Sequence, residues 1–151
     1  MADLILSAAG TVTIPAISHF NVHEYLYQCT KEDQWFQISN LLSLTERDIP
    51  ETRLSSYILT KNSRDWKITH EVDIKRVHTK FWHLAYLLSR HDKGELKILL
   101  DNGFANVFYI NHAGDTRVVE VYQHWERWYF AESLIKDDAP WGAGNQFFFL
   151  E

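Results

Sequence analysis

Apolar side chains recur at helical spacing in three segments of the first two-thirds of the chain. Residues 31–44 open with an acidic first turn and then repeat apolar positions every three or four residues, which predicts an amphipathic helix. Residues 48–61 show the same offsets, although their run LSSYIL is equally typical of a strand. The most regular stripe lies in residues 74–91, where Asp73 can act as the N-cap and Gly94 lies just beyond the last turn.

Strict alternation, which is typical of strands, replaces this spacing in the other segments. Residues 65–72 (DWKITHEV) alternate and predict a short strand between two helices. Further along, two apolar runs flank the hairpin signal DNG at 101–103, and Gly114 marks a second turn before the run TRVVEVYQHW. Strands at about 127–135 and 146–150 complete the series. The C-terminal part is therefore predicted to form an antiparallel meander.

Helices first and strands afterwards predict an α+β fold. In it, the N-terminal helices pack on one face of a twisted antiparallel sheet formed mainly by the C-terminal half. Residues 1–151 contain no repeat, low-complexity tract or linker, so we expect a single globular domain. The order of predicted elements resembles the cone-shaped layout of nuclear-transport-factor-2-like proteins. The resemblance concerns layout only, and it implies a pocket between a concave sheet and the helices.

The segment VYQHWERWYF, residues 121–130, has an ambiguous period. As a strand, it would place Tyr122, His124 and Glu126 on one face, whereas helical spacing would instead form a continuous apolar stripe. The β-branched residues before it and the preceding turn favour a strand, with room for a bulge at 125–127.

These three side chains are the candidate catalytic group. Glu126 could orient the imidazole of His124 as an acid or base, and Tyr122 could donate a hydrogen bond to a substrate. The alternative is a polar, half-exposed strand face without any chemistry. No nucleophile motif or nucleotide-binding motif accompanies the group.

Aromatic residues make up 15% of the chain, which suggests an aromatic surface that lines a ligand pocket or binds a partner. The candidate binding residues are Trp125, Trp128, Trp141 and Phe148. Trp141 lies in a loop rich in Gly and Pro, just before the run QFFFL. As an edge strand, this run would have to be buried or would favour self-association.

Other features exclude whole classes of function. A net charge of −5 argues against nucleic-acid binding, and no apolar run is long enough to span a membrane. The first residues lack the basic start of a signal peptide, and Cys29 is the only cysteine, so a cytoplasmic protein is expected. His19 and His23 lack a third ligand at a recognised spacing, so we expect no metal and no other cofactor.

Two functions are consistent with the sequence. The first is a non-catalytic binding or interaction domain. It would form a homodimer or bind another protein through aromatic surface, or hold a small apolar molecule in a pocket. The second is a small-molecule isomerase, dehydratase or hydrolase that uses His124, Glu126 and Tyr122. An enclosed cavity around these three residues would favour the enzyme.

Overall fold

Strands dominate the computed structural model, which describes residues 4–31, 34–95, 97–135 and 139–151. It contains 46% strand and 24% helix. The predicted fold of N-terminal helices on a C-terminal sheet is therefore wrong, because strands begin at Leu6 and the short helices are distributed among them. The layout that resembled nuclear-transport-factor-2-like proteins fails for the same reason. No helix in the described ranges has the length and apolar content needed to cross a membrane.

Short connections join most of the elements, and both ends of the described chain contribute strands to the main sheet. In chain order the elements are β1 (Leu6–Ile14), β2 (Ile17–Asn21), α1 (Val22–Lys31), β3 (Trp35–Gln37), the 3-10 helix η1 (Asn40–Ser43), β4 (Thr45–Ile49), β5 (Thr52–Leu59), α2 (Asp65–His70), α3 (Ile74–Val77), β6 (His78–Thr79), α4 (Phe81–Asp92), β7 (Asn106–His112), β8 (Asp115–His124), β9 (Arg127–Leu134) and β10 (Gln146–Leu150).

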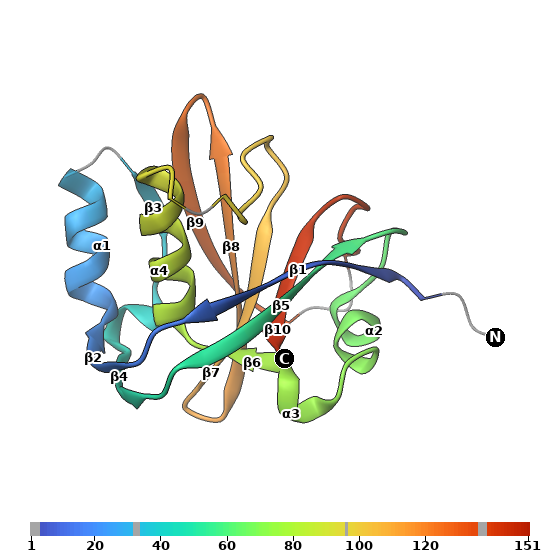
Figure 1. Cartoon of the computed structure of the whole chain (residues 1–151), viewed down its shortest axis with the longest axis horizontal. Helices are drawn as coiled ribbons and strands as arrows, with labels where there is room; N and C mark the ends of the chain where they lie inside the picture. The colour runs from blue at the N-terminus through green and yellow to red at the C-terminus, as the bar shows by residue number, and fades with distance from the viewer. Residues whose placement is uncertain (1–3, 32–33, 96, 136–138) are drawn as a thin grey trace.

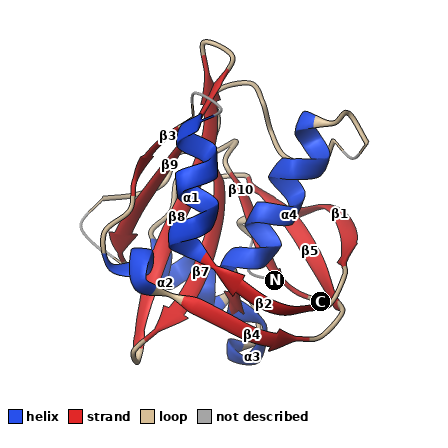
Figure 2. Ribbon diagram, turned by 90° about the vertical axis from the view of Figure 1, so that its left-hand side faces the viewer, coloured by secondary structure: helices blue, strands red, loops and turns tan. Residues whose placement is uncertain are grey.

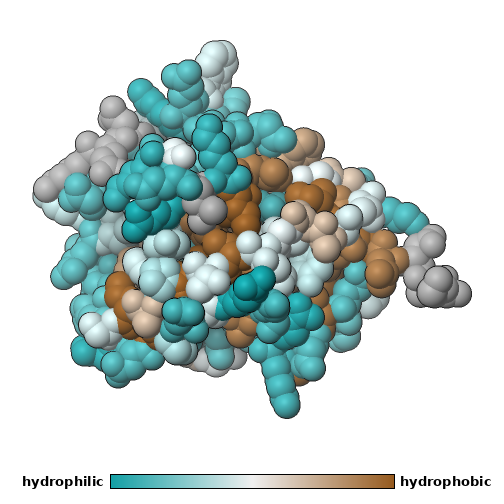
Figure 3. Space-filling model, viewed as in Figure 1, coloured by the Kyte–Doolittle hydropathy of each residue, from teal (hydrophilic) through white to brown (hydrophobic). Residues whose placement is uncertain are grey.

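The main sheet is mixed and follows the order β1-β5-β10-β7-β8-β9-β3, with β6 beside β7. The pairs β10–β7, β3–β9 and β6–β7 are parallel, and the others are antiparallel. Strands β2 and β4 form a separate two-stranded sheet. In Figure 1, α1 and α4 lie at one end of the molecule, and α2 and α3 lie at the other. The face in Figure 3 is largely hydrophilic, with apolar residues gathered near its middle.

Each face of the sheet has its own apolar core, because successive strand residues point to opposite sides. On the face covered by α1 and α4, the ring of Phe148 stacks on that of Phe108, with centroids 4.7 Å apart. On the face covered by α2 and α3, Phe147 and Phe149 pack beside Tyr109. The run QFFFL therefore lies at the centre of the sheet, between β5 and β7, and not at its edge.

The predicted helices differ most from the structure. Residues 31–44 contain β3 and η1, and residues 48–61 contain β5, so only the alternative strand assignment of the second segment is confirmed. Residues 74–91 are interrupted at His78–Thr79, because these two residues pair with β7. The side chain of Asp73 does accept a hydrogen bond from the Lys75 amide, but the helix that it caps is α3.

The predicted strand at 65–72 is wrong, because this segment forms α2. Asp65 at its start is buried and accepts hydrogen bonds from the Tyr109 hydroxyl, at 2.7 Å, and the Trp141 indole, at 2.6 Å. Buried Ile68 faces the core. The two partners of Asp65 are distant in the sequence, so the alternating pattern alone could not indicate the helix.

The C-terminal strands agree better with the predictions. Strands at β7, β8, β9 and β10 are confirmed, as is the turn at Gly114, where φ is +85°. The hairpin predicted around 101–103 is absent, since residues 97–100 form no strand. The meander covers only β7, β8 and β9, because β10 pairs with β5 and, in parallel, with β7.

Candidate functional site

The β8–β9 hairpin projects beyond the helices and carries the most exposed aromatic side chain of the described residues (Figure 2). Its strands pair without a break from Arg117 and Leu134 to His124 and Arg127. Trp125 and Glu126 form the two-residue turn, with φ of +54° and +63°. Positive φ at both positions is typical of a type I′ turn, so the strands are joined by a tight hairpin and not by the predicted bulge.

The three candidate catalytic residues all lie near this tip, but they do not form a connected group. Tyr122 stacks on Tyr129, with centroids 5.4 Å apart, and the exposed ring of His124 meets Tyr129 edge-on at 6.3 Å. Glu126 belongs to the turn and is exposed. Within the described part of the chain, no hydrogen bond joins Tyr122, His124 and Glu126 to one another. Burial, the Glu120 carboxylate and Tyr129 raise the pKa of Tyr122, which favours its protonated form.

Three rings lie in register across the neighbouring strands and define the aromatic row: Trp35, Tyr129 and Tyr122. They point away from the α1 and α4 face, where Trp128 and Phe130 are buried. The Trp35 side chain is 57% exposed, because it occupies the edge strand β3. Trp35 was not predicted as a surface residue, because the spacing of residues 31–44 predicted a helix.

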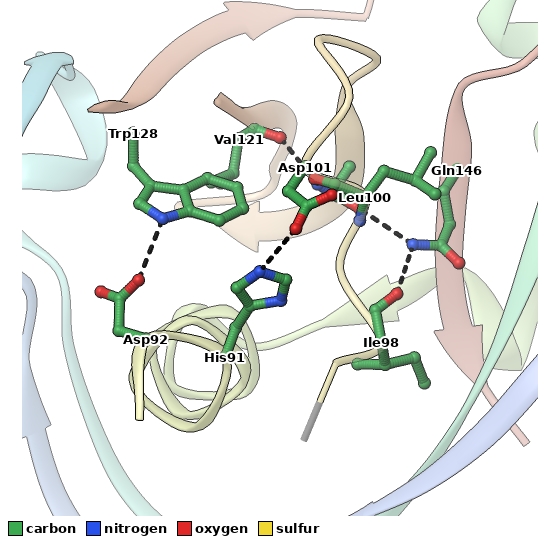
Figure 4. Close-up of polar contacts among 9 residues, drawn as sticks. His91, Asp92, Ile98, Leu100, Asp101, Val121, Trp128 and Gln146 are labelled. Carbon is green, nitrogen blue, oxygen red and sulfur yellow. Dashed lines mark hydrogen bonds and ion pairs between the residues drawn. The ribbon is translucent and has the colours of Figure 1, made fainter. Parts of the chain in front are cut away.

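Trp128, one of the predicted binding residues, belongs to β9, and its side chain is buried on the face covered by α1 and α4. Its indole N–H donates a hydrogen bond to Asp92 Oδ1 at 3.0 Å, and its ring lies edge-on to His91 (Figure 4). The other carboxylate oxygen of Asp92 accepts a hydrogen bond from Gln34 Nε2 at 3.3 Å. Asp92 therefore fixes both the indole and the start of β3 to the C-terminal end of α4.

An open hollow of about 520 Å³ lies between the hairpin, the end of α4 and the residue before β3. We call it the hairpin hollow. Most of its side chains are polar, and indole groups supply the remainder. The residues that line it are Gln34, Asp92, Gln123, Trp125, Glu126, Arg127 and Trp128. Trp125, Glu126 and Trp128 were candidate site residues from the sequence. The others were missed because Gln34 and Asp92 are remote in the chain and no motif connects them with the hairpin.

A separate buried polar cluster connects β7, β10 and the segment after α4 (Figure 4). The side chain of Asn106 bonds both the amide and the carbonyl of Leu100, at 2.8 and 3.0 Å, and it also donates to the Val121 carbonyl. Gln146 donates hydrogen bonds to Asn106 Oδ1 and to the Ile98 carbonyl. These contacts attach the connection between α4 and β7 to the sheet, so we assign the cluster a structural role.

The remaining two predicted binding residues lie away from the hairpin. Phe148 is fully buried in the core. Trp141 is half-buried, donates its indole N–H to Asp65 and lies edge-on to Phe147. In the structure Trp141 therefore closes the opposite face of the sheet.

Metal-binding side chains do not converge in the described ranges: no group of three His, Cys, Asp or Glu side chains is placed to hold an ion. His19 lies on β2 and His23 lies on α1, and both are exposed. No known family model, curated protein or solved structure gives a significant match to the chain. The contacts of its own residues are therefore the basis for a functional proposal.

Proposed function

We propose that the chain is a non-catalytic binding domain that holds a small polar ligand in the hairpin hollow. The main support is the position of Trp125, whose side chain is 83% exposed although the turn that carries it is tightly constrained. An exposed indole offers a ligand a large, rigid and partly apolar surface, because burying it is favourable. The volume of about 520 Å³ lies within the range of small-molecule sites, about 300–1,000 Å³.

Unpaired polar side chains beside this indole also favour binding. The side chains of Gln123, Glu126 and Arg127 line the hollow and make no hydrogen bond or ion pair with the other described residues. Their donors and acceptors are therefore free to bind a ligand. The polar lining gives less support to the apolar ligand that the sequence analysis considered.

Catalysis is less well supported than binding. Both oxygens of Asp92 accept hydrogen bonds from protein side chains, which gives this carboxylate a structural role. His124 is exposed on the open surface and is not paired with a carboxylate. Acid–base chemistry by His124, Glu126 and Tyr122 remains an alternative hypothesis. A screen of small-molecule substrates would test it by comparing turnover by the unaltered protein with turnover by His124→Ala.

The binding proposal can be tested by NMR with a library of polar fragments and uniformly 15N-labelled protein. We expect several fragments to shift the amides of residues 123–127, the side-chain amides of Gln34 and Gln123, and the Trp125 indole signal. Trp125→Ala should abolish these shifts. The matched control is Trp66→Ala, which removes a half-exposed indole from α2 and should leave them unchanged. A library without hits at the hairpin, or hits that persist in Trp125→Ala, would contradict the proposal.

Self-association through the aromatic row is the second candidate. It is favoured by the exposure of Trp35 on an edge strand next to two tyrosines in register. A tryptophan has about 250 Å² of surface, so Trp35 exposes only about 140 Å² that a dimer could bury. This area is small for an interface, so we expect a weak dimer at best. Sedimentation equilibrium should show reversible dimerisation that Trp35→Ser weakens and Trp66→Ser does not. A monomer at every accessible concentration would exclude this candidate.

A further inference from the structure

The charged residues of the hairpin hollow give its lining a net charge of −1. Glu126 and Arg127 carry the unpaired charges of its lining, and these have opposite signs. The third charged residue, Asp92, already accepts hydrogen bonds from Trp128 and Gln34. These two donors are uncharged, so Asp92 keeps its negative charge, and the two carboxylates of the lining would repel an anionic ligand.

The polar side chains of the lining include both donors and acceptors. Gln123 offers an amide oxygen and an NH₂ group. The Nε2 atom of Gln34 already donates to Asp92 and its Oε1 atom is buried, so Gln34 contributes little to ligand binding. With the acceptor oxygens of Glu126 and the donors of Arg127, the hollow presents both kinds of group close together. A hydroxyl group both donates and accepts, so adjacent hydroxyls match such a lining.

The indole of Trp125 adds a flat apolar surface at the rim. Its ring is exposed and sits on a turn with little conformational freedom, so ligand binding requires little additional ordering. Pyranose rings present a face of C–H groups and a perimeter of hydroxyls. One sugar ring can therefore stack on the indole while its hydroxyls reach the amide and charged side chains.

From this combination we infer that the ligand of the hairpin hollow is a neutral carbohydrate. The inference rests on the proposed binding function and specifies the ligand of the same site. Gln123 and Arg127 would bind the hydroxyls, and Trp125 would stack on the sugar ring. A peptide could also use the indole, but it would bring backbone amides and fixed charges in place of adjacent hydroxyls.

The test is saturation-transfer NMR of the full chain with a panel of neutral hexoses, N-acetylhexosamines and their linear oligosaccharides. We expect at least one sugar to bind, with saturation strongest on the ring C–H protons that face Trp125. Gln123→Leu should weaken this binding at least tenfold, and Trp125→Ala should abolish it. The matched control, Trp66→Ala, should bind like the unaltered protein. Unchanged urea midpoints would show that the variants remain folded.

The outcomes separate the two proposals. Hits from the fragment library without any sugar binding would overturn the carbohydrate assignment and leave the binding domain standing. Failure of both screens would overturn both proposals. Sugar binding that survives Trp125→Ala, or binding of charged peptides alone at the hollow, would also refute the assignment.

Discussion

Replacing Glu132 by Gln should show how firmly the edge of the sheet beside the hairpin is held. The side chain of Glu132 is 1% exposed, and that of its ion-pair partner Arg117 is 13% exposed. Its Oε2 atom accepts from Arg117 Nε at 2.8 Å, and its Oε1 atom accepts from the amides of Ser39 and Leu41, each at 3.0 Å. One carboxylate therefore attaches both β8 and the segment after β3 to β9.

The expected loss of stability follows from the hydrogen bonds that a glutamine at position 132 can still make. Its amide oxygen can accept from the two backbone amides, but its NH₂ group faces the guanidinium, so Arg117 is left partly buried without a counter-charge. Removing one partner of a buried pair costs about 3–5 kcal/mol, and the retained hydrogen bonds place Glu132→Gln near about 3 kcal/mol. For a domain of this size, that is a fall in Tm of about 6–12 °C.

Urea unfolding at pH 7, followed by tryptophan fluorescence, measures the free energy, and a double-mutant cycle with Arg117→Gln separates the pair from its surroundings. The double variant should cost about 2 kcal/mol less than the sum of the single variants, because neither charge is then left alone. A loss below about 1 kcal/mol for Glu132→Gln, or strict additivity, would refute a buried ion pair at this position.

The pH dependence gives a second check on Glu132. Burial raises the pKa of this carboxyl, but hydrogen bonds from the Leu41 amide, Arg117 and the Ser39 amide outweigh it, and the net effect is a lowered pKa. Because the pKa is lower in the folded state, the stabilisation is present above the unfolded value and is lost as pH falls through the folded value. Glu132→Gln should remove this part of the acid dependence.

Two further predictions concern sites away from the hairpin. Burial and Lys80 lower the pKa of His83 to about 4, so stability should fall by about 3 kcal/mol as pH drops from about 6.5 to 4. Burial raises the pKa of Glu46, and this effect increases stability as the pH falls, so it opposes the effect of His83. The test is therefore a comparison at each pH of the unfolding free energies of the unaltered protein and of His83→Gln, both measured in urea. A difference that does not vary with pH would contradict the prediction. Gly144→Ala should cost about 2 kcal/mol by thermal melting, because φ is +103° and the new Cβ would lie 2.9 Å from Phe104. Gly142→Ala, which meets nothing closer than 4.0 Å, should be close to neutral, and equal losses would refute the assignment.

The sequence predicted the strands of the C-terminal part because their β-branched and aromatic residues alternate between two buried faces. It failed where long-range contacts decide the local structure. The pairing of His78–Thr79 with β7 breaks an otherwise regular helical stripe, and the partners of Asp65 fix α2 from more than forty residues away. The site shows the same limit. Trp125 was identifiable from its local pattern, whereas Gln34 and Asp92 join it only through the tertiary fold.

The central position of β10 has a consequence for biosynthesis. Strands β5 and β7 cannot be bridged until the ribosome has translated residue 150, so the two halves of the sheet emerge with unsatisfied inner edges and uncovered cores. The nascent polypeptide must therefore wait for β10 before its sheet can close, a delay during which transient aggregation is a hazard. A stop codon placed just before Gln146 should accordingly yield insoluble product, even though every residue of the hairpin has been made.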